Sequence, residues 1–381
     1  MIIVLADDLT GAAEIAGLGH LYGLSVTLLT SLPKVLPQSQ LVVLATDTRS
    51  MTAFRAVQEV QHLCRQLQGL LSKNKEKQII FKKVDACLRG HVVEEIQAVL
   101  QDTDYQQSVY LPANPARGQV IRGGCLYIDD TPFDQTEYAP LTDTPAYTSS
   151  LCLHFSITPQ SRIRVPDAVS FDDVLQIVGQ VMDDDIPTLL TGSADLFTAL
   201  LQNLGYQPTE EVEFPGLSKE GSTLVVCGSP HNNDLSRCTF LNHKELPLDS
   251  MPRDVFDGNQ SASYWLASIN LRHFSRAAIQ PARNGLILNI PYERSCSAES
   301  ALRLRTEMAQ VVSALLDQMQ PAELVIEGGT TALAIIQRMG WTHFDITDHI
   351  SSTILRMQCP DLPSLHITFK PGSAPWGSVS Q

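Results

Sequence analysis

The chain has 381 residues, of which 44% are hydrophobic and 18% are charged, and its formal net charge is −14 at pH 7. The length favours two or three domains, and the acidic balance argues against nucleic acid or an anionic membrane surface as a partner. We expect a cytoplasmic protein, because no basic leader precedes the first strand and no apolar run approaches the roughly 20 residues that a bilayer requires. A local group of Lys and Arg can still bind a small anionic substrate. A homodimer stays open as the oligomeric state.

Strand and helix signals alternate through the first two hundred residues. Apolar and β-branched runs predict strands at 1–6, 25–30, 41–45, 79–84, 108–111 and 188–191. Residues at helical spacing predict helices from 12 onwards, at 52–71, 94–100 and 172–182, and after 193. The segment 122–164 is rich in Pro, Thr, Asp and Tyr, and we expect it to run over the surface as an extended excursion.

A polar stretch with two prolines, at 205–222, predicts a linker. A second run of strands follows it, from 223 and at 286–290, 323–326 and 365–369. Strands separated by helices indicate parallel sheets. We therefore expect two Rossmann-like α/β domains with mainly parallel sheets and a cleft between them. The expected bounds are 1–210 for the first domain, 211–222 for the linker and 223–381 for the second domain.

The first predicted strand ends in Asp7, Asp8 and Thr10, just where a helix begins. Adjacent carboxylates repel each other, so they persist best where a ligand hydroxyl, a cation or a proton transfer needs them. In open α/β sheets, ligands bind at the carboxyl ends of strands and at the helix N-termini beside them. The alternative is simple helix capping by Asp8 or Thr10, although a cap needs only one such residue.

A second cluster, KKVDACLRGH at 82–91, also follows a strand. Arg89 can grip a carboxylate, Lys83 can neutralise charge and Asp85 can accept from a hydroxyl, which together suit an anionic polyol. The alternative is a solvated turn with a weak surface ion pair. In the third cluster, PANPARG at 112–118, Asn114 and Arg117 could point into the same cleft.

Three glycine turns follow strands of the second half, at 227–229, 327–331 and 370–373. Glycine lets backbone N–H groups approach phosphate oxygens, and hydroxyls at helix starts complete an anion cradle. These turns predict a nucleotide site, with Lys370 beside the last of them. The sequence lacks a GxxxxGK[ST] loop, a GxGxxG turn after a strand and any CxxC pair, so it predicts no P-loop, dinucleotide or thiolate metal site.

These motifs, in this order, resemble the four-carbon acid sugar kinases, which include the D-threonate, D-erythronate and 3-oxo-tetronate kinases. The motifs are ADDLTGA at 6–12, KKVDACLRG at 82–90, PANPARG at 112–118, VVCGS at 225–229, EGGTTA at 327–332 and KPGS at 370–373. The resemblance implies an N-terminal acid-sugar-binding domain and a C-terminal nucleotide-binding domain. It implies an acid-sugar site lined by Asp7, Asp8, Thr10, Lys83, Asp85 and Arg89. It also implies ATP contacts from Ser229, Gly328, Gly329, Thr330, Thr331 and Gly372.

The sequence therefore predicts a kinase that transfers phosphate from ATP to an acid-sugar hydroxyl in carbohydrate catabolism. One of Asp7, Asp8 and Asp85 would accept the hydroxyl proton. Mg²⁺ is expected to accompany ATP in this chemistry, with no protein ligand assignable from the sequence. Two alternatives stay open: a hydroxy-acid oxidoreductase, and a non-catalytic nucleotide- or metabolite-binding protein with a degenerate ATP site.

Overall fold

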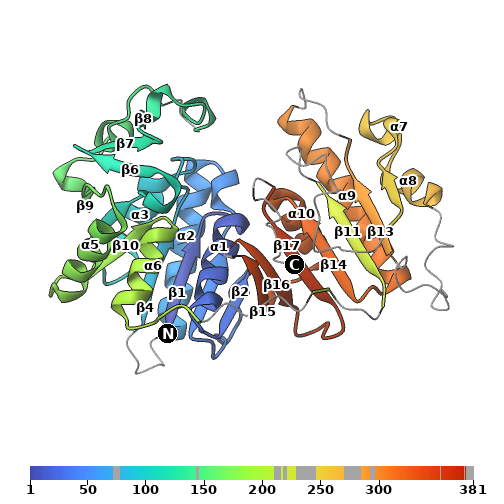
Figure 1. Ribbon diagram of the computed structural model, residues 1–381, viewed down its shortest axis with the longest axis horizontal. Helices are drawn as coiled ribbons and strands as arrows, with labels where there is room; N and C mark the ends of the chain where they lie inside the picture. The colour runs from blue at the N-terminus through green and yellow to red at the C-terminus, as the bar shows by residue number, and fades with distance from the viewer. Residues whose placement is uncertain are drawn as a thin grey trace. The chain divides into compact units, whose positions relative to one another are not determined.

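The computed structural model describes residues 1–71, 78–142, 146–209, 216–217, 221–228, 246–269, 285–291, 297–351, 353–372 and 374. The chain divides into two compact units, Met1–Glu210 and Glu211–Gln381. In Figure 1 the first unit runs from blue to green and the second from yellow to red. Each unit combines helices with a mostly parallel sheet, so the predicted α/β fold is confirmed.

The sheet of the first unit has the strand order β2-β3-β1-β4-β10-β5-β9, and all its described pairings are parallel. Its inner strands β1 and β3 are buried along their whole length, which explains why they are apolar without alternation. The strands are β1 (Ile2–Ala6), β2 (Val26–Leu29), β3 (Leu41–Ala45), β4 (Ile79–Lys83), β5 (Gln107–Leu111), β9 (Ile163–Arg164) and β10 (Thr188–Gly192).

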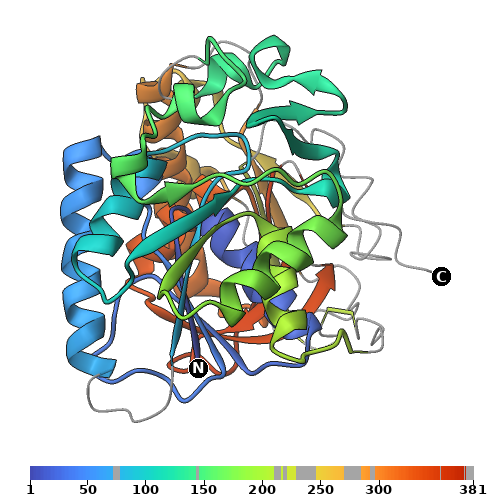
Figure 2. The same ribbon diagram turned by 90° about the vertical axis from the view of Figure 1, so that its left-hand side faces the viewer.

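Helices cover both faces of this sheet (Figure 2). Helix α2 packs against α3, and α5 packs against α6 on the opposite face. The helices are α1 (Leu9–Leu21), α2 (Ala53–Leu71), α3 (Val92–Gln101), α4 (Leu151–His154), α5 (Phe171–Asp183) and α6 (Ala194–Asn203). Short 3₁₀ turns are η1 (Thr48–Ser50), η2 (Pro115–Arg117), η3 (Phe133–Gln135), η4 (Ala139–Leu141) and η5 (Pro159–Ser161).

The expected surface excursion over 122–164 is wrong as an extended segment, because much of it is folded. Strands β6 (Gln119–Arg122), β7 (Cys125–Ile128) and β8 (Thr131–Pro132) form a small antiparallel sheet. Four apolar side chains in and after this sheet are fully buried: Ile121, Leu126, Phe133 and Leu151. Its strands are too short for their pattern to be distinguished from a polar loop in the sequence.

The second unit has the strand order β12-β13-β11-β14-β17-β16-β15. Five of these strands are parallel, whereas β15 and β16 form an antiparallel hairpin that the sequence did not predict. The strands are β11 (Thr223–Cys227), β12 (Leu248–Ser250), β13 (Gly285–Asn289), β14 (Glu323–Glu327), β15 (His343–Ser351), β16 (Ile354–Gln358) and β17 (His366–Lys370). The helices are α7 (Arg253–Phe256), α8 (Ala262–Ser268), α9 (Ala298–Met319) and α10 (Gly329–Met339).

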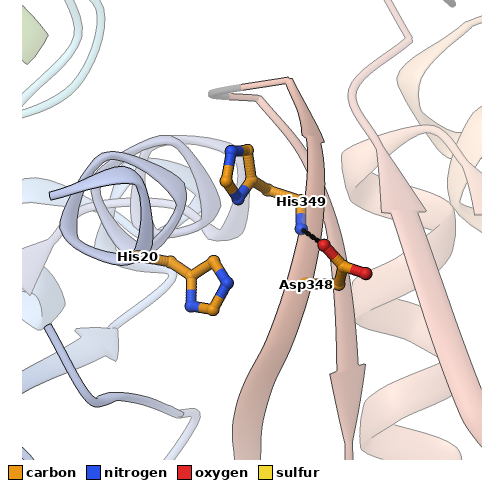
Figure 3. A group of neighbouring side chains, drawn as sticks. All are labelled: His20, Asp348 and His349. Carbon is orange, nitrogen blue, oxygen red and sulfur yellow. Dashed lines mark hydrogen bonds between the residues drawn. The ribbon is translucent and has the colours of Figure 1, made fainter. Parts of the chain in front are cut away.

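The β15–β16 hairpin is irregular near Asp348 and His349. Its register shifts twice, between Ile346 and Asp348 and between His349 and Ser351. In Figure 3 the backbone N–H of His349 donates to Asp348 Oδ1, at 2.8 Å. Bulges of this kind bend a strand and redirect its side chains. The bulged strand here is β15, which stands last in the strand order of the second unit.

Among the described residues, no helix is both long and apolar enough to cross a membrane.

Candidate functional site

The acidic turn after β1 lies in the interior of the first unit. Asp7 is 2% exposed, and Asp8 is half-buried. Asp8 Oδ1 accepts a hydrogen bond from the backbone N–H of Gly11 at 2.7 Å, so Asp8 caps helix α1. The capping interpretation is therefore right for Asp8. Thr10, half-buried, is already inside the first turn of α1.

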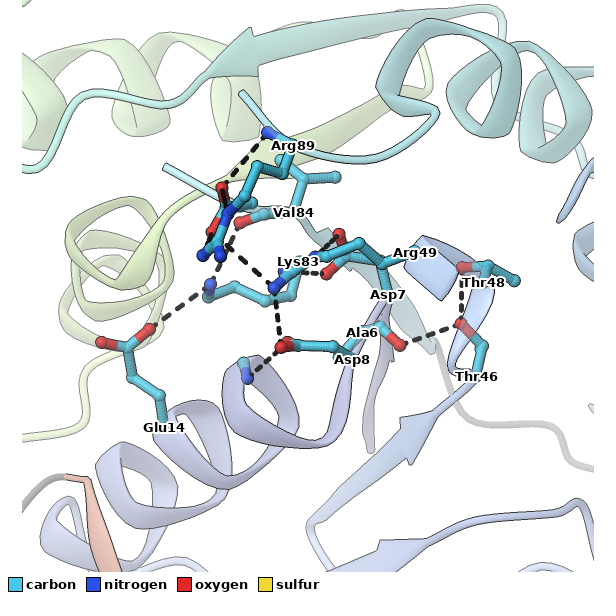
Figure 4. A network of polar contacts seen from close by, with 12 residues as sticks. Ala6, Asp7, Asp8, Glu14, Thr46, Thr48, Arg49, Lys83, Val84 and Arg89 are labelled. Atoms are coloured by element: carbon cyan, nitrogen blue, oxygen red, sulfur yellow. Dashed lines mark hydrogen bonds and ion pairs between the residues drawn. The ribbon is translucent and has the colours of Figure 1, made fainter. Parts of the chain in front are cut away.

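Arg49 joins the two carboxylates of this turn (Figure 4). Its Nε and Nη2 donate to Asp7 Oδ2 and Oδ1 at 3.0 and 2.8 Å, and its Nη1 donates to Asp8 Oδ2 at 2.6 Å. The same Nη1 lies 3.8 Å from Asp85 Oδ1. One guanidinium thus reduces the repulsion between the two carboxylates, and it binds Asp7 in the bidentate geometry that Arg favours.

The sequence analysis missed Arg49, although a signal was available. Arg49 lies four residues after β3, in the 3₁₀ turn Thr48–Ser50, and β3 pairs in parallel with β1. The carboxyl ends of parallel neighbours meet at one edge of a sheet, so polar residues after β3 belong beside those after β1.

Two strand residues, Lys82 and Lys83, point to opposite faces of the sheet, as adjacent strand residues must. Lys82 is fully buried and its Nζ lies 2.8 Å from Glu95 Oε2, which also accepts from Thr48 Oγ1 at 3.0 Å. Lys83 Nζ instead lies 3.3 Å from Glu14 Oε2 on α1. Lys83 is therefore the lysine that accompanies the acidic turn.

Asp85 and Arg89 form a bidentate pair in the turn after β4. Arg89 Nε and Nη2 donate to Asp85 Oδ2 and Oδ1, each at 2.8 Å, and the Arg89 side chain is 45% exposed. The backbone is strained at Leu88, which has φ +63°, whereas Gly90 adopts φ +90° without strain because it has no Cβ. A Cβ on Gly90 would lie 3.3 Å from Asp7 Oδ2, so the turn packs directly on the acidic pair.

The surroundings of Asp8 and Asp85 shift the pKa values of the two side chains in opposite directions. Burial raises the pKa of Asp8, and the charge of Asp7 adds to this against the lowering effect of Arg49. Burial alone would also raise the pKa of Asp85, but the hydrogen bonds from Arg89 and the charge of Arg49 outweigh it and lower the pKa to about 2. Asp8 therefore holds a proton more readily than Asp85.

The third sequence cluster is connected to the other two through Glu14. Arg117 Nη2 lies 2.7 Å from Glu14 Oε1, and the Arg117 side chain is 54% exposed. Asn114 is buried at 3% exposure, next to the carboxylate of Asp195. His91, which ends the second cluster, contacts the carbonyl oxygen of Met51 through Nε2 at 2.7 Å.

In the second unit, the ends of β11, β14 and β17 are in register. Cys227 pairs with Glu327, and Glu327 pairs with Lys370. The ladder continues into the turns, because Gly228 N–H donates to Glu327 O at 3.0 Å and Gly328 N–H donates to Lys370 O at 2.9 Å. The three glycine turns therefore begin side by side, although Ser229 lies outside the described residues and Gly372 is half-buried.

Helix α10 starts inside this group of turns, at Gly329. Its N-cap is Gly328, with φ +107°, and within the described part of the chain no side chain caps the helix. Backbone N–H groups at the start of a helix, here from Gly329 to Thr331, are the groups that bind anions. A Cβ on Gly228 would lie 2.0 Å from Thr331 Oγ1, so this close packing requires glycine.

Lys370 is buried rather than displayed at these turns. Its side chain is 0% exposed, and its Nζ lies 3.3 Å from Glu327 Oε1 and donates to Pro371 O at 3.1 Å. Glu327 is itself 1% exposed. The lysine and glutamate thus form a buried pair beneath the glycine turns.

Comparisons with known proteins find similarity over most of the chain. Residues 2–171 match a family model described as a sugar-binding N-terminal domain. The D-threonate kinase of Salmonella typhimurium is 22% identical over 403 residues, covering 95% of this chain and 93% of the relative. The 3-oxo-tetronate kinase of Actinobacillus succinogenes is 26% identical, covering 92% of this chain and 91% of the relative.

The fold is also similar to that of a solved Salmonella typhimurium protein. The TM-score is 0.77 at 18% identity, covering 98% of this chain and 96% of that one. Residues 2–171 are thus similar to the sugar-binding N-terminal domain, and the resemblance of the chain to the four-carbon acid sugar kinases is confirmed.

Proposed function

We propose that the protein is a cytoplasmic, ATP-dependent kinase of carbohydrate catabolism that phosphorylates a hydroxyl of a four-carbon acid sugar: threonate, erythronate or 3-oxo-tetronate. The observation that carries the proposal is the buried ionic cluster of Asp7, Asp8, Arg49 and Asp85 at the carboxyl end of the first unit's sheet. The substrate class comes from the relatives that match over most of their length, a D-threonate kinase and a 3-oxo-tetronate kinase.

The acid-sugar carboxylate would bind to the half-exposed arginines. Arg89 and Arg117 are each held on one side by a buried carboxylate, Asp85 and Glu14 respectively, and are 45% and 54% exposed. A guanidinium ordered in this way can offer its remaining donors to an incoming carboxylate at little entropic cost. Lys83 and Thr10 would contribute charge and a hydroxyl beside them.

Asp8 is the residue we assign as the proton acceptor. A general base works best when its pKa lies closer to the working pH, and burial raises the pKa of Asp8 whereas the pKa of Asp85 is lowered to about 2. Asp7 is held by two hydrogen bonds from Arg49, which suits it to fix that arginine. Asp85 would likewise orient Arg89.

ATP would bind at the glycine turns of the second unit. The start of α10 at Gly329, Thr330 and Thr331 would offer N–H groups to phosphate oxygens, and Gly328 and Gly372 carry no Cβ that could obstruct their approach. Mg²⁺ bound with ATP would neutralise phosphate charge. Lys370 would act from beneath the turns, through its pair with Glu327. Transfer requires the two sites to meet during turnover.

A coupled ADP-release assay with a panel of four-carbon acid sugars tests the proposal. We expect ATP-dependent turnover with at least one of D-threonate, D-erythronate and the 3-oxo-tetronates. Asp8→Asn and Arg89→Ala should each lower turnover by about a hundredfold. Glu94→Gln, on the exposed face of α3, is the matched control and should keep wild-type activity.

Other results of this assay would favour the alternatives. Binding of ATP and an acid sugar without ADP release would indicate a metabolite-binding protein. Turnover that depends on a nicotinamide cofactor, and not on ATP, would indicate an oxidoreductase.

A further inference from the structure

Glu14 is a buried carboxylate without an evident role in the sequence. It is the only acidic residue of α1 and lies on the buried side of the helix, 9% exposed among mostly small and apolar neighbours. Burial of an ionised carboxylate is costly unless the group is paired and hydrogen-bonded. The partners of Glu14 should therefore explain why this helix carries it.

Those partners come from two other parts of the first unit. Glu14 Oε2 lies 3.3 Å from Lys83 Nζ at the end of β4, and Glu14 Oε1 lies 2.7 Å from Arg117 Nη2 in the turn η2. Each carboxylate oxygen serves one cation (Figure 4 shows the Lys83 side of this contact). One residue thus links α1, β4 and the loop that contains η2.

A second carboxylate holds the backbone of the same loop. Asp195 Oδ2 accepts from the N–H of Ala116 at 2.9 Å, and the side-chain amide of Asn114 donates to Asp195 at 2.9 and 3.0 Å once its oxygen and nitrogen are exchanged. Asp195 thus holds the loop at the backbone of Ala116, and Glu14 holds it through the guanidinium of Arg117. The two contacts constrain different parts of the loop.

We propose that Glu14 is a positioning residue that holds Lys83 and Arg117 as a preformed cationic pair for the carboxylate of the acid sugar. The inference rests on the proposed function, because it needs an anionic substrate. Ordering a long side chain at the moment of binding lowers affinity, and Glu14 does this ordering during folding. Lys83 is 5% exposed and needs the pairing, whereas Arg117 keeps half of its surface available to a ligand.

The sign of the change in KM separates this role from two simpler ones. Glu14→Gln keeps the shape of the side chain but removes its charge. If Glu14 acted only as a nearby negative charge, its removal would strengthen binding of an anion and lower KM. If Glu14 were only structural, the variant would lose active protein without a change in KM. A positioning role predicts that KM for the acid sugar rises about tenfold, with kcat and the KM for ATP nearly unchanged.

A double-mutant cycle with Arg117 tests whether Glu14 acts through this arginine. Arg117→Ala should raise KM for the acid sugar, and adding Glu14→Gln to it should raise KM further by less than about threefold, because both variants remove the same ordered guanidinium. Glu94→Gln is the control for loss of an exposed carboxylate in this unit. Should Glu14→Gln fail to fold, Glu14→Asp, which keeps the charge but shortens the reach, replaces it with the same expected rise in KM.

Hydrogen exchange gives a readout that does not depend on catalysis. Glu14→Gln should speed amide exchange at residues 116–118 relative to Glu94→Gln. Unchanged exchange, or a KM for the acid sugar that is unchanged or lowered, would overturn the inference. If the wild type phosphorylates no acid sugar, the proposed function fails, and exchange at 116–118 then decides by itself whether Glu14 holds the loop.

Discussion

Arg49→Met is the substitution that should damage the first unit most directly. The change keeps much of the length and apolar stem of the side chain but removes the guanidinium that donates to Asp7 at 3.0 and 2.8 Å and to Asp8 at 2.6 Å. Asp7, which is 2% exposed, would then be a buried carboxylate without its cation. Water cannot readily replace that cation at so buried a position.

Loss of one partner from a buried ion pair typically costs about 3–5 kcal/mol. We expect a value in this range, since Asp7 loses a bidentate contact and Asp8 a further hydrogen bond. For a unit of this size, about 1 kcal/mol lowers Tm by roughly 2–4 °C. The melting transition of the first unit should therefore fall by roughly 6–20 °C at neutral pH.

The measurement is urea and thermal unfolding of the full chain, followed by hydrogen exchange of the buried amides of β1 and β4 so that the first unit is observed by itself. Arg65→Met is the control, because Arg65 is 62% exposed and lies 3.5 Å from Asp102, a pair worth about 0–1 kcal/mol. A loss of stability in Arg49→Met no larger than that in Arg65→Met would show that the ion pairs of Arg49 do not stabilise the first unit.

Three further predictions concern stability. The fold lowers the pKa of Asp85 from 3.8 to about 2, so its carboxylate contributes stability above about pH 4 that is lost as the pH falls towards 2. Asp85→Asn should flatten the decline between pH 5 and 2.5 of the free energy of unfolding measured in urea, and an unaltered slope would contradict this. Lys82→Met and Glu95→Leu should each destabilise the protein strongly, because each single change leaves a buried charge without its partner. The double variant should lose at least about 1 kcal/mol less free energy of unfolding than the two single variants lose together, and strict additivity would show that the pair does not interact. Gly228→Ala should destabilise the second unit by about 1–3 kcal/mol, since its Cβ would lie 2.0 Å from Thr331 Oγ1. Gly69→Ala, at a position in α2 with open space around it, should be neutral or stabilising, and an equal effect of the two substitutions on stability would show that packing at Gly228 does not matter.

The sequence predicted the parallel part of the fold well, because buried parallel strands are continuous apolar runs. The run at 2–6 and the run at 41–45 needed only their length and composition to be identified. The β15–β16 hairpin was missed, since β15 carries polar residues along a half-exposed strand and lacks a tight-turn signature. The small sheet within 119–132 was missed for a similar reason, as its strands contain four residues at most.

The sequence predicted which residues gather at one edge of the sheet better than it predicted their contacts. Polar residues after buried strands indicated that Asp7, Asp8 and Asp85 lie near one another, and period-two alternation explains why Lys83 lies at the acidic turn and Lys82 does not. Pairing, however, is a tertiary property: Arg49 and Glu14 reach their partners from η1 and α1, across distances in sequence that no local pattern encodes. The same holds for Lys370, whose ion pair with Glu327 places its ammonium inside the unit.

In the proposed reaction, phosphate passes from ATP to an acid-sugar hydroxyl with Asp8 as the proton acceptor. Phosphorus NMR of the wild type with ATP, Mg²⁺ and D-threonate, D-erythronate or a 3-oxo-tetronate measures this transfer directly. We predict that the γ-phosphate signal of ATP is replaced by an equal amount of a phosphomonoester with at least one of these substrates, and that Asp8→Asn slows the replacement by about a hundredfold. Release of inorganic phosphate alone, or a phosphomonoester formed equally fast by Asp8→Asn, would contradict it.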